Sequence, residues 1–134
     1  MSLNNNLCPC KSGQDYTQCC GAFISGESIP DTAEKLMRSR YSAYVKEEIK
    51  YLKETLWPRQ QADFNELGTL IRAKDSRWLG LEVLETDKGL KGDIEGYVLF
   101  IARSVVDGIV NEQREKSLFR KKTGRWYYVK ALSE

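Results

Sequence analysis

The residues best suited to chemistry lie near the N-terminus. The chain has four cysteines, Cys8, Cys10, Cys19 and Cys20, in the pattern C-x-C, eight residues, then C-C. Four thiols at this spacing suit a tetrahedral Zn²⁺ site, because sulfur fills all four positions and leaves none open for water. The pattern therefore predicts a structural zinc knuckle in which these cysteines are the ligands and folding depends on the metal.

Two other roles for the cysteines are open. A pair of disulfides is disfavoured because Cys19 and Cys20 are adjacent, and adjacent cysteines strain the geometry of every pairing. A redox dithiol usually has the spacing C-x-x-C beside a βαβ pattern, which this sequence lacks. We therefore expect zinc, with Ser12 and Gly13 forming the tight turn that brings the chain back to the metal.

The 134 residues include no histidine, and this excludes several classes of active site. A Ser-His-Asp or Cys-His nucleophile, a histidine general base and a mixed Cys/His metal site are all impossible. We identify no catalytic residues and no organic cofactor site. The sequence favours a role other than catalysis, although it leaves enzymatic activity open.

Composition and charge narrow the class of protein further. The formal net charge is +2 at pH 7, and it becomes zero if four thiolates bind one Zn²⁺. A near-neutral protein is poorly suited to general binding of nucleic acid. No stretch approaches the ~20 apolar residues of a membrane-spanning helix, and residues 1–7 have no signal-peptide pattern. We expect a cytoplasmic protein without membrane insertion.

The cysteine segment has a known counterpart. Residues 8–21 read C-P-C-x-S-G-x-x-Y-x-x-C-C-G, which resembles the SEC-C motif named for the C-terminal tail of the SecA translocase motor. In that tail the module binds zinc and contacts the chaperone SecB. The resemblance implies that this chain also holds Zn²⁺ and that a protein partner binds through the zinc module.

The rest of the chain must position this module. Asp31 with Glu34 three residues later predicts a helix N-cap and capping box. Apolar residues then recur at helical spacing, which predicts helices over 33–45, over 49–56 and over 63–74. After residue 77 the period becomes that of strands, separated by turn signals that contain glycine. We predict four strands, at 78–85, 94–105, 110–119 and 126–131.

Helices followed by a strand meander indicate the α+β class, with helices packed on a curved four-stranded antiparallel sheet. Segments of the body resemble the YchJ-like bacterial proteins, and they lie at residues 36–44, 78–83, 115–119 and 124–129. That resemblance implies a cone like that of the nuclear transport factor, with a pocket between helices and sheet. The function of that family is unassigned. We predict a SEC-C module over 1–28 and a cone-like domain over 29–134.

One charged residue falls on the apolar face of the first predicted helix. A guanidinium at Arg40 must be paired or must line a cavity, and we expect it to meet Glu82 or Glu115. A polar cluster there would suit a small anion or a carbonyl compound. The alternative is a structural ion pair between helix and sheet. The residues of this possible pocket are Arg40, Tyr41, Tyr44, Glu82 and Glu115.

A basic run precedes three aromatic residues near the C-terminus. Its cations are Arg114, Lys116, Arg120, Lys121, Lys122 and Arg125. Such a run next to aromatic rings is typical of single-stranded nucleic-acid binding, but a solvated hairpin tip is favoured because strand alternation already explains the pattern.

Three functions are therefore open. The leading hypothesis is a zinc-binding adaptor that contacts a protein through the SEC-C module. The second is a pocket enzyme or small-molecule binder that uses the cone, and the third is RNA or ribosome binding through the basic hairpin.

Overall fold

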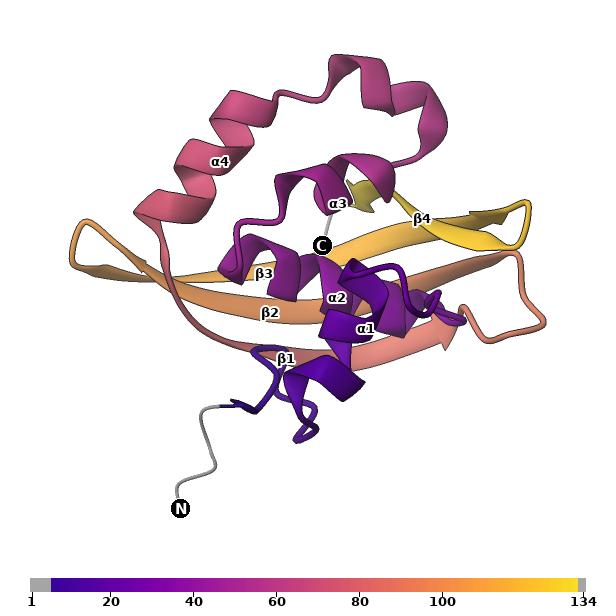
Figure 1. Ribbon diagram of the computed structural model, residues 1–134, viewed down its shortest axis with the longest axis horizontal. Coiled ribbons are helices and arrows are strands. Elements are labelled where there is room, and N and C mark those ends of the chain that lie inside the picture. Colours follow the sequence, from indigo (N-terminus) through magenta and orange to yellow (C-terminus); the bar gives the residue numbers. More distant parts are fainter. Residues whose placement is uncertain (1–5, 133–134) are drawn as a thin grey trace.

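A computed structural model describes residues 6–132, and Figure 1 shows its helices gathered on one side of a curved antiparallel sheet. The four strands follow one another in space in chain order, β1-β2-β3-β4. The predicted α+β class, with helices on a four-stranded antiparallel sheet, is confirmed. Among the residues described, no helix is long and apolar enough to cross a lipid bilayer.

The helical elements named within residues 6–132 are 3₁₀ turns and α-helices. In chain order they are η2 (Tyr16–Gln18), α1 (Cys20–Ile24), α2 (Ala33–Val45), α3 (Ile49–Glu54), η3 (Pro58–Asp63) and α4 (Glu66–Asp75). The helix predicted over 33–45 has these bounds in the structure, whereas the helix predicted from residue 63 begins three residues later.

The caps explain both helix starts. Thr32, and not Asp31, is the N-cap of α2, since its side chain accepts a hydrogen bond from the Lys35 backbone N–H. Asp31 instead pairs with the ammonium groups of Lys35 and Lys91. Asn65 caps α4 by accepting from the Gly68 N–H at 2.8 Å, so the segment before it is left as the 3₁₀ turn η3.

Each predicted strand lies within an observed strand to within one residue. The strands are β1 (Arg77–Lys88), β2 (Glu95–Val106), β3 (Ile109–Lys122) and β4 (Arg125–Leu132). Two tight hairpins join β2 to β3 and β3 to β4. Both residues of each turn have positive φ, as two-residue hairpin turns of type I′ require, and these turns are Asp107-Gly108 and Thr123-Gly124.

Glycines let the sheet bend and let α2 attach to it. The register of β1 against β2 shifts between Trp78 and Gly80, so a bulge bends the strand there. At Gly96 an added Cβ would lie 2.3 Å from the Gly89 Cα. This close approach places the Gly89 carbonyl where it accepts a hydrogen bond from the Ala33 N–H at 2.9 Å. The start of α2 is therefore tied to the loop between β1 and β2.

The main hydrophobic core joins the cysteine module to the body. Cys8, Cys10 and Cys20 are buried in one cluster with side chains of α2 and of the sheet, including Leu36 and Phe119. The predicted boundary at residues 28 and 29 falls between α1 and α2, but side chains on its two sides share this core. The module is thus embedded against α2 and is not a separate knuckle on a stalk.

Candidate metal centre and pocket

The four cysteines meet at one point beside α2. Cys8 and Cys10 come from the N-terminal loop, whereas Cys19 is the N-cap of α1 and Cys20 is its first residue. Their sulfur atoms all lie within 4.8 Å of one another, and the Sγ atoms of Cys10 and Cys19 are 3.7 Å apart. Sulfur ligands about 2.3 Å from a tetrahedral Zn²⁺ would stand roughly 3.8 Å apart. The residues present therefore fit a metal ion.

Backbone hydrogen bonds fold the loop around this point. The Cys8 N–H donates to the Gln14 carbonyl at 2.8 Å, and the Lys11 N–H donates to the Cys8 carbonyl at 3.1 Å. Lys11 and Gly13 both have positive φ, at 69° and 89°, so the turn predicted at Ser12-Gly13 begins one residue earlier. Within this turn, the Ser12 hydroxyl oxygen lies 3.2 Å from the Cys19 Sγ.

Burial and mutual contact set the protonation of the thiols. Hydrogen bonds from Cys10 and Cys20 lower the pKa of Cys8. Hydrogen bonds to Cys10 and Cys8, together with burial, raise the pKa of Cys20. Packed thiols share their protons in this way because several thiolates at this distance would repel one another. A divalent cation removes that repulsion, so this donor set suits a metal ion.

Residues of α2 hold the module from behind. Arg38 Nη1 donates to the Cys10 carbonyl at 2.8 Å, and the Ser42 hydroxyl lies 3.5 Å from the Cys8 sulfur. Gly21 is also required, because an added Cβ there would lie 2.7 Å from the Tyr16 carbonyl oxygen and 2.8 Å from its ring. The supports from Arg38 and Ser42 were not found in the sequence, where both read only as ordinary helix residues.

A second polar site lies between α2, α4 and the sheet, as a pocket of about 150 Å³. Four of the five residues proposed for a pocket line it, namely Arg40, Tyr41, Tyr44 and Glu115. Glu82 does not. It lies on the outer face of the sheet, where its 52% exposed side chain pairs with Arg103 at 3.1 Å. Alternation along β1 buries Leu81 and so turns Glu82 outward.

The prediction that Arg40 meets Glu82 or Glu115 is wrong. Arg40 Nη1 donates to the Leu52 carbonyl at 2.8 Å and to the Thr55 hydroxyl at 2.7 Å. The guanidinium also lies over the ring of Tyr128, 4.8 Å from its centroid. Desolvation lowers the pKa of Arg40. Its partners are neutral groups, because α3 and the segment after it come close enough to satisfy the guanidinium.

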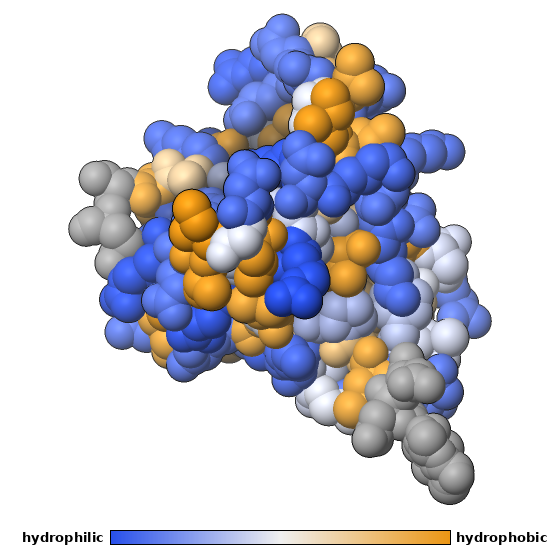
Figure 2. Space-filling view, turned by 90° about the vertical axis from the view of Figure 1, so that its left-hand side faces the viewer, coloured by the Kyte–Doolittle hydropathy of each residue, from blue (hydrophilic) through white to orange (hydrophobic). Residues whose placement is uncertain are grey.

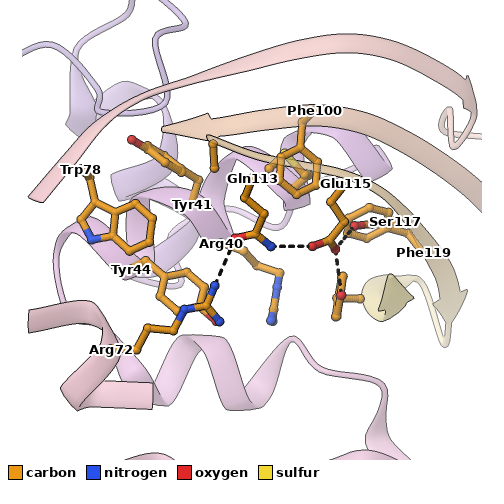
Figure 3. Close-up of a pocket in the computed structure, with 13 residues that line it drawn as sticks. Arg40, Tyr41, Tyr44, Arg72, Trp78, Phe100, Gln113, Glu115, Ser117 and Phe119 are labelled. Atoms are coloured by element: carbon orange, nitrogen blue, oxygen red, sulfur yellow. Dashed lines mark hydrogen bonds between the residues drawn. The ribbon is translucent and has the colours of Figure 1, made fainter. Parts of the chain in front are cut away.

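A chain of hydrogen bonds crosses the wall of the pocket (Figure 3). Arg72 Nη2 donates to the Gln113 amide oxygen at 3.1 Å, and Gln113 Nε2 donates to Glu115 at 2.9 Å. Glu115 also accepts from the hydroxyls of Ser117 and Tyr128. Gln113 and Ser117 were missed in the sequence, although their i, i+2, i+4 spacing with Glu115 places all three on one face of β3.

The basic run lies along β3 and the hairpin that joins it to β4. Three of its lysines cover aromatic rings: Lys116 lies over Tyr97, Lys121 over Trp126 and Lys122 over Trp57, at 5.1 to 5.7 Å from the ring centroids. These ring faces are in contact with ammonium groups of the same chain, an arrangement that a solvated hairpin also adopts.

The sequence and the fold are similar to those of known proteins. The family described as "YchJ, middle NTF2-like domain" matches residues 32–131, and the SEC-C motif matches residues 5–22. A UPF0225 protein of Geobacter sulfurreducens is 45% identical over 124 residues, which make up 92% of this chain and 77% of that protein. A UPF0225 protein of Actinobacillus succinogenes is 42% identical over 96% of this chain and 82% of its own length.

Two solved structures share the fold. The solution structure of a SEC-C motif containing protein from Rhodopseudomonas palustris superimposes with a TM-score of 0.87 at 35% identity, over 95% of this chain and 98% of that chain. The crystal structure of a SEC-C motif containing protein from Psychrobacter arcticus gives a TM-score of 0.81 at 27% identity, over 95% and 83% of the two chains. The likeness therefore covers both the cysteine module and the body.

Proposed function

The chain belongs to the YchJ-like family of UPF0225 proteins, and on that premise we propose that it is a zinc-binding adaptor that presents its SEC-C module to a protein partner. The observation that carries this proposal is the convergence of four cysteine sulfurs within 4.8 Å, directly beneath an exposed loop. The function of the family itself is unassigned.

The donor set favours Zn²⁺ over other metal ions. Four sulfur ligands and no oxygen or histidine ligand select soft or borderline metals, and zinc is the usual occupant of tetrahedral Cys₄ sites. Cys8, Cys10, Cys19 and Cys20 would hold the ion. A bound Zn²⁺ would supply a cross-link between the loop and α1. Four protein ligands fill its coordination, so the site suits a structural role.

The module offers a face to a partner. Residues 11–15 and 17–18 are exposed, and a groove of about 670 Å³ runs from this loop to the start of α2 and the end of β1. The groove carries Lys35, Arg38 and Lys88; Lys35 pairs with Asp31 and Arg38 with Glu34, whereas Lys88 has no ion pair among the described residues. Its charge suits a partner segment with acidic side chains. A reducing compartment such as the cytoplasm would keep the thiols available for metal.

The SecA resemblance supplies a defined partner for the test, namely purified SecB. We expect isothermal titration of the zinc-loaded protein to detect SecB binding, and Lys88→Glu to weaken it by introducing a like charge toward an acidic segment. Lys130→Glu is the matched control, because Lys130 is exposed on β4 and lies outside the groove. An equal loss in both variants, or no binding to the zinc-loaded protein, would contradict this adaptor function.

A further inference from the structure

We propose that the pocket between α2 and the sheet binds a small aromatic monocarboxylate, with the guanidinium of Arg40 as its anion-binding group. This site is distinct from the cysteine cluster, and the adaptor function does not require it. The pocket holds a partly buried cation, aromatic walls and an opening to solvent.

The partly buried Arg40 cation lacks a counterion. Arg40 donates only through Nη1, to the carbonyl of Leu52 and the hydroxyl of Thr55, and it has no ion pair within residues 6–132. Burying a guanidinium with neutral partners leaves its charge uncompensated. Its Nε and Nη2 form no hydrogen bond with the residues described, and they are not among the fully buried atoms that lack a partner. These nitrogens therefore reach open space, and the pocket is the space that Arg40 lines.

The nearby carboxylate is already occupied. Both oxygens of Glu115 accept hydrogen bonds, one from Gln113 and the other from the hydroxyls of Ser117 and Tyr128. Three donors fix Glu115 on the β3 wall, so it is not free to turn toward Arg40. With Arg72 at the far end of the same network (Figure 3), the pocket holds two guanidinium groups and one carboxylate. One net positive charge remains, which a monoanion balances.

Aromatic rings form most of the remaining surface. Tyr41 meets Trp78 edge to face, with ring centroids 5.7 Å apart, and Tyr44 lies at the same distance from Trp78. Phe100 and Phe119 line the sheet side. Such walls favour a planar ring over a flexible chain. The volume of about 150 Å³ matches one ring, since an engineered apolar cavity of about 150 Å³ accepts benzene.

The pocket has a route to the surface. A second hollow of about 240 Å³ shares Arg72, Trp78, Ala102 and Gln113 with it and continues along the sheet toward the β2–β3 hairpin. That end of the molecule faces the viewer in Figure 2, which shows hydrophobic side chains gathered among hydrophilic ones. A ligand of this size can therefore enter beside α4 without unfolding the sheet.

The test uses the zinc-loaded full chain and benzoate as the probe, with uncharged benzamide as its isostere, at constant ionic strength. Binding is followed by the indole N–H resonances of the three tryptophans in ¹⁵N-labelled protein. We expect benzoate to shift the Trp78 resonance, to leave Trp57 unchanged, and to bind roughly tenfold tighter than benzamide, as one charge-assisted hydrogen bond provides.

Variants identify the cation responsible. Arg40→Met should abolish the preference for benzoate over benzamide. If that variant does not fold, Arg72→Met at the rim should weaken benzoate binding about threefold or more, while Arg103→Met, on the outer face of the sheet, should leave it unchanged. Equal affinity for benzoate and benzamide, no shift of Trp78 at millimolar benzoate, or equal effects of Arg72→Met and Arg103→Met would overturn the proposal.

Discussion

Replacing Arg38 with methionine should loosen the cysteine module from the body. Arg38 lies on α2 and donates through Nη1 to the Cys10 carbonyl at 2.8 Å and through Nε to Glu34 at 3.0 Å. Methionine keeps the unbranched stem and the helix propensity of the side chain but removes both contacts. The contact with Cys10 spans 28 residues of sequence, so its loss acts on the docking of the loop and not on α2 itself.

The two contacts differ in strength. A hydrogen bond from a charged donor contributes about 1.5–3 kcal/mol, whereas an i,i+4 ion pair on a helix surface contributes about 0.3–0.5 kcal/mol. The Arg38 side chain is 22% exposed, so water can partly replace the lost donor. We therefore take the lower end, about 1.5 kcal/mol for the contact with Cys10. If opening of the module limits metal loss, zinc should leave about tenfold faster.

Two assays measure the effect. Guanidinium unfolding of the zinc-loaded protein gives the free energy of unfolding, and transfer of zinc to a chromophoric chelator gives the release rate. Glu34→Gln is the matched control, because it removes the ion pair and keeps the contact of Arg38 with Cys10. The reasoning fails if Glu34→Gln accelerates zinc release as much as Arg38→Met, or if Arg38→Met behaves as wild type in both assays.

Two further predictions concern the body of the protein. Gly96→Ala should lower the free energy of unfolding by about 1–3 kcal/mol in a denaturant titration, because the new Cβ would lie 2.3 Å from the Gly89 backbone. The control is Gly92→Ala, whose new Cβ would have no atom within 4 Å, and it should stay within about 0.5 kcal/mol of wild type. Equal losses in the two variants would refute the close approach of Gly96 to Gly89. Burial raises the pKa of Tyr51 to about 12, above the usual value of about 10, so its contribution to stability is full below pH ~10 and is lost as the pH rises toward 12. Tyr51→Phe should therefore flatten the fall of unfolding free energy over that range, and an unchanged slope would contradict this assignment.

Local signals in the sequence were sufficient for the fold. Positive φ at Asp107-Gly108 and Thr123-Gly124 is what those residue types favour, so the hairpins were predictable from short-range chemistry. The start of α2 was predicted correctly but its N-cap was not, because Asp31 and Thr32 are both good caps and Asp31 pairs instead with Lys35 and with distant Lys91. The contact with Lys91 is long-range and is not visible in a local window.

Of the two candidate sites, the cysteine cluster was predictable from local sequence and the pocket was not. The four cysteines lie within thirteen residues, so their convergence in the structure was predictable from their spacing alone. The pocket depends on which strand face each side chain takes and on how closely α3 approaches α2. Glu82 was misplaced because burial of Leu81 turns it to the outer face, and Arg40 donates instead to the Leu52 carbonyl and the Thr55 hydroxyl. Such contacts follow from packing that the sequence pattern does not contain.

X-ray absorption at the zinc edge, combined with metal analysis of protein purified without chelator, tests the central claim most directly. We predict one zinc ion per chain with four sulfur neighbours at about 2.3 Å. In the Cys19→Ala variant the zinc ion should have fewer sulfur neighbours. A first shell containing nitrogen or oxygen in the wild-type protein would contradict the account. So would a reduced, metal-free protein in which the segment around Cys8 and Cys20 keeps its order.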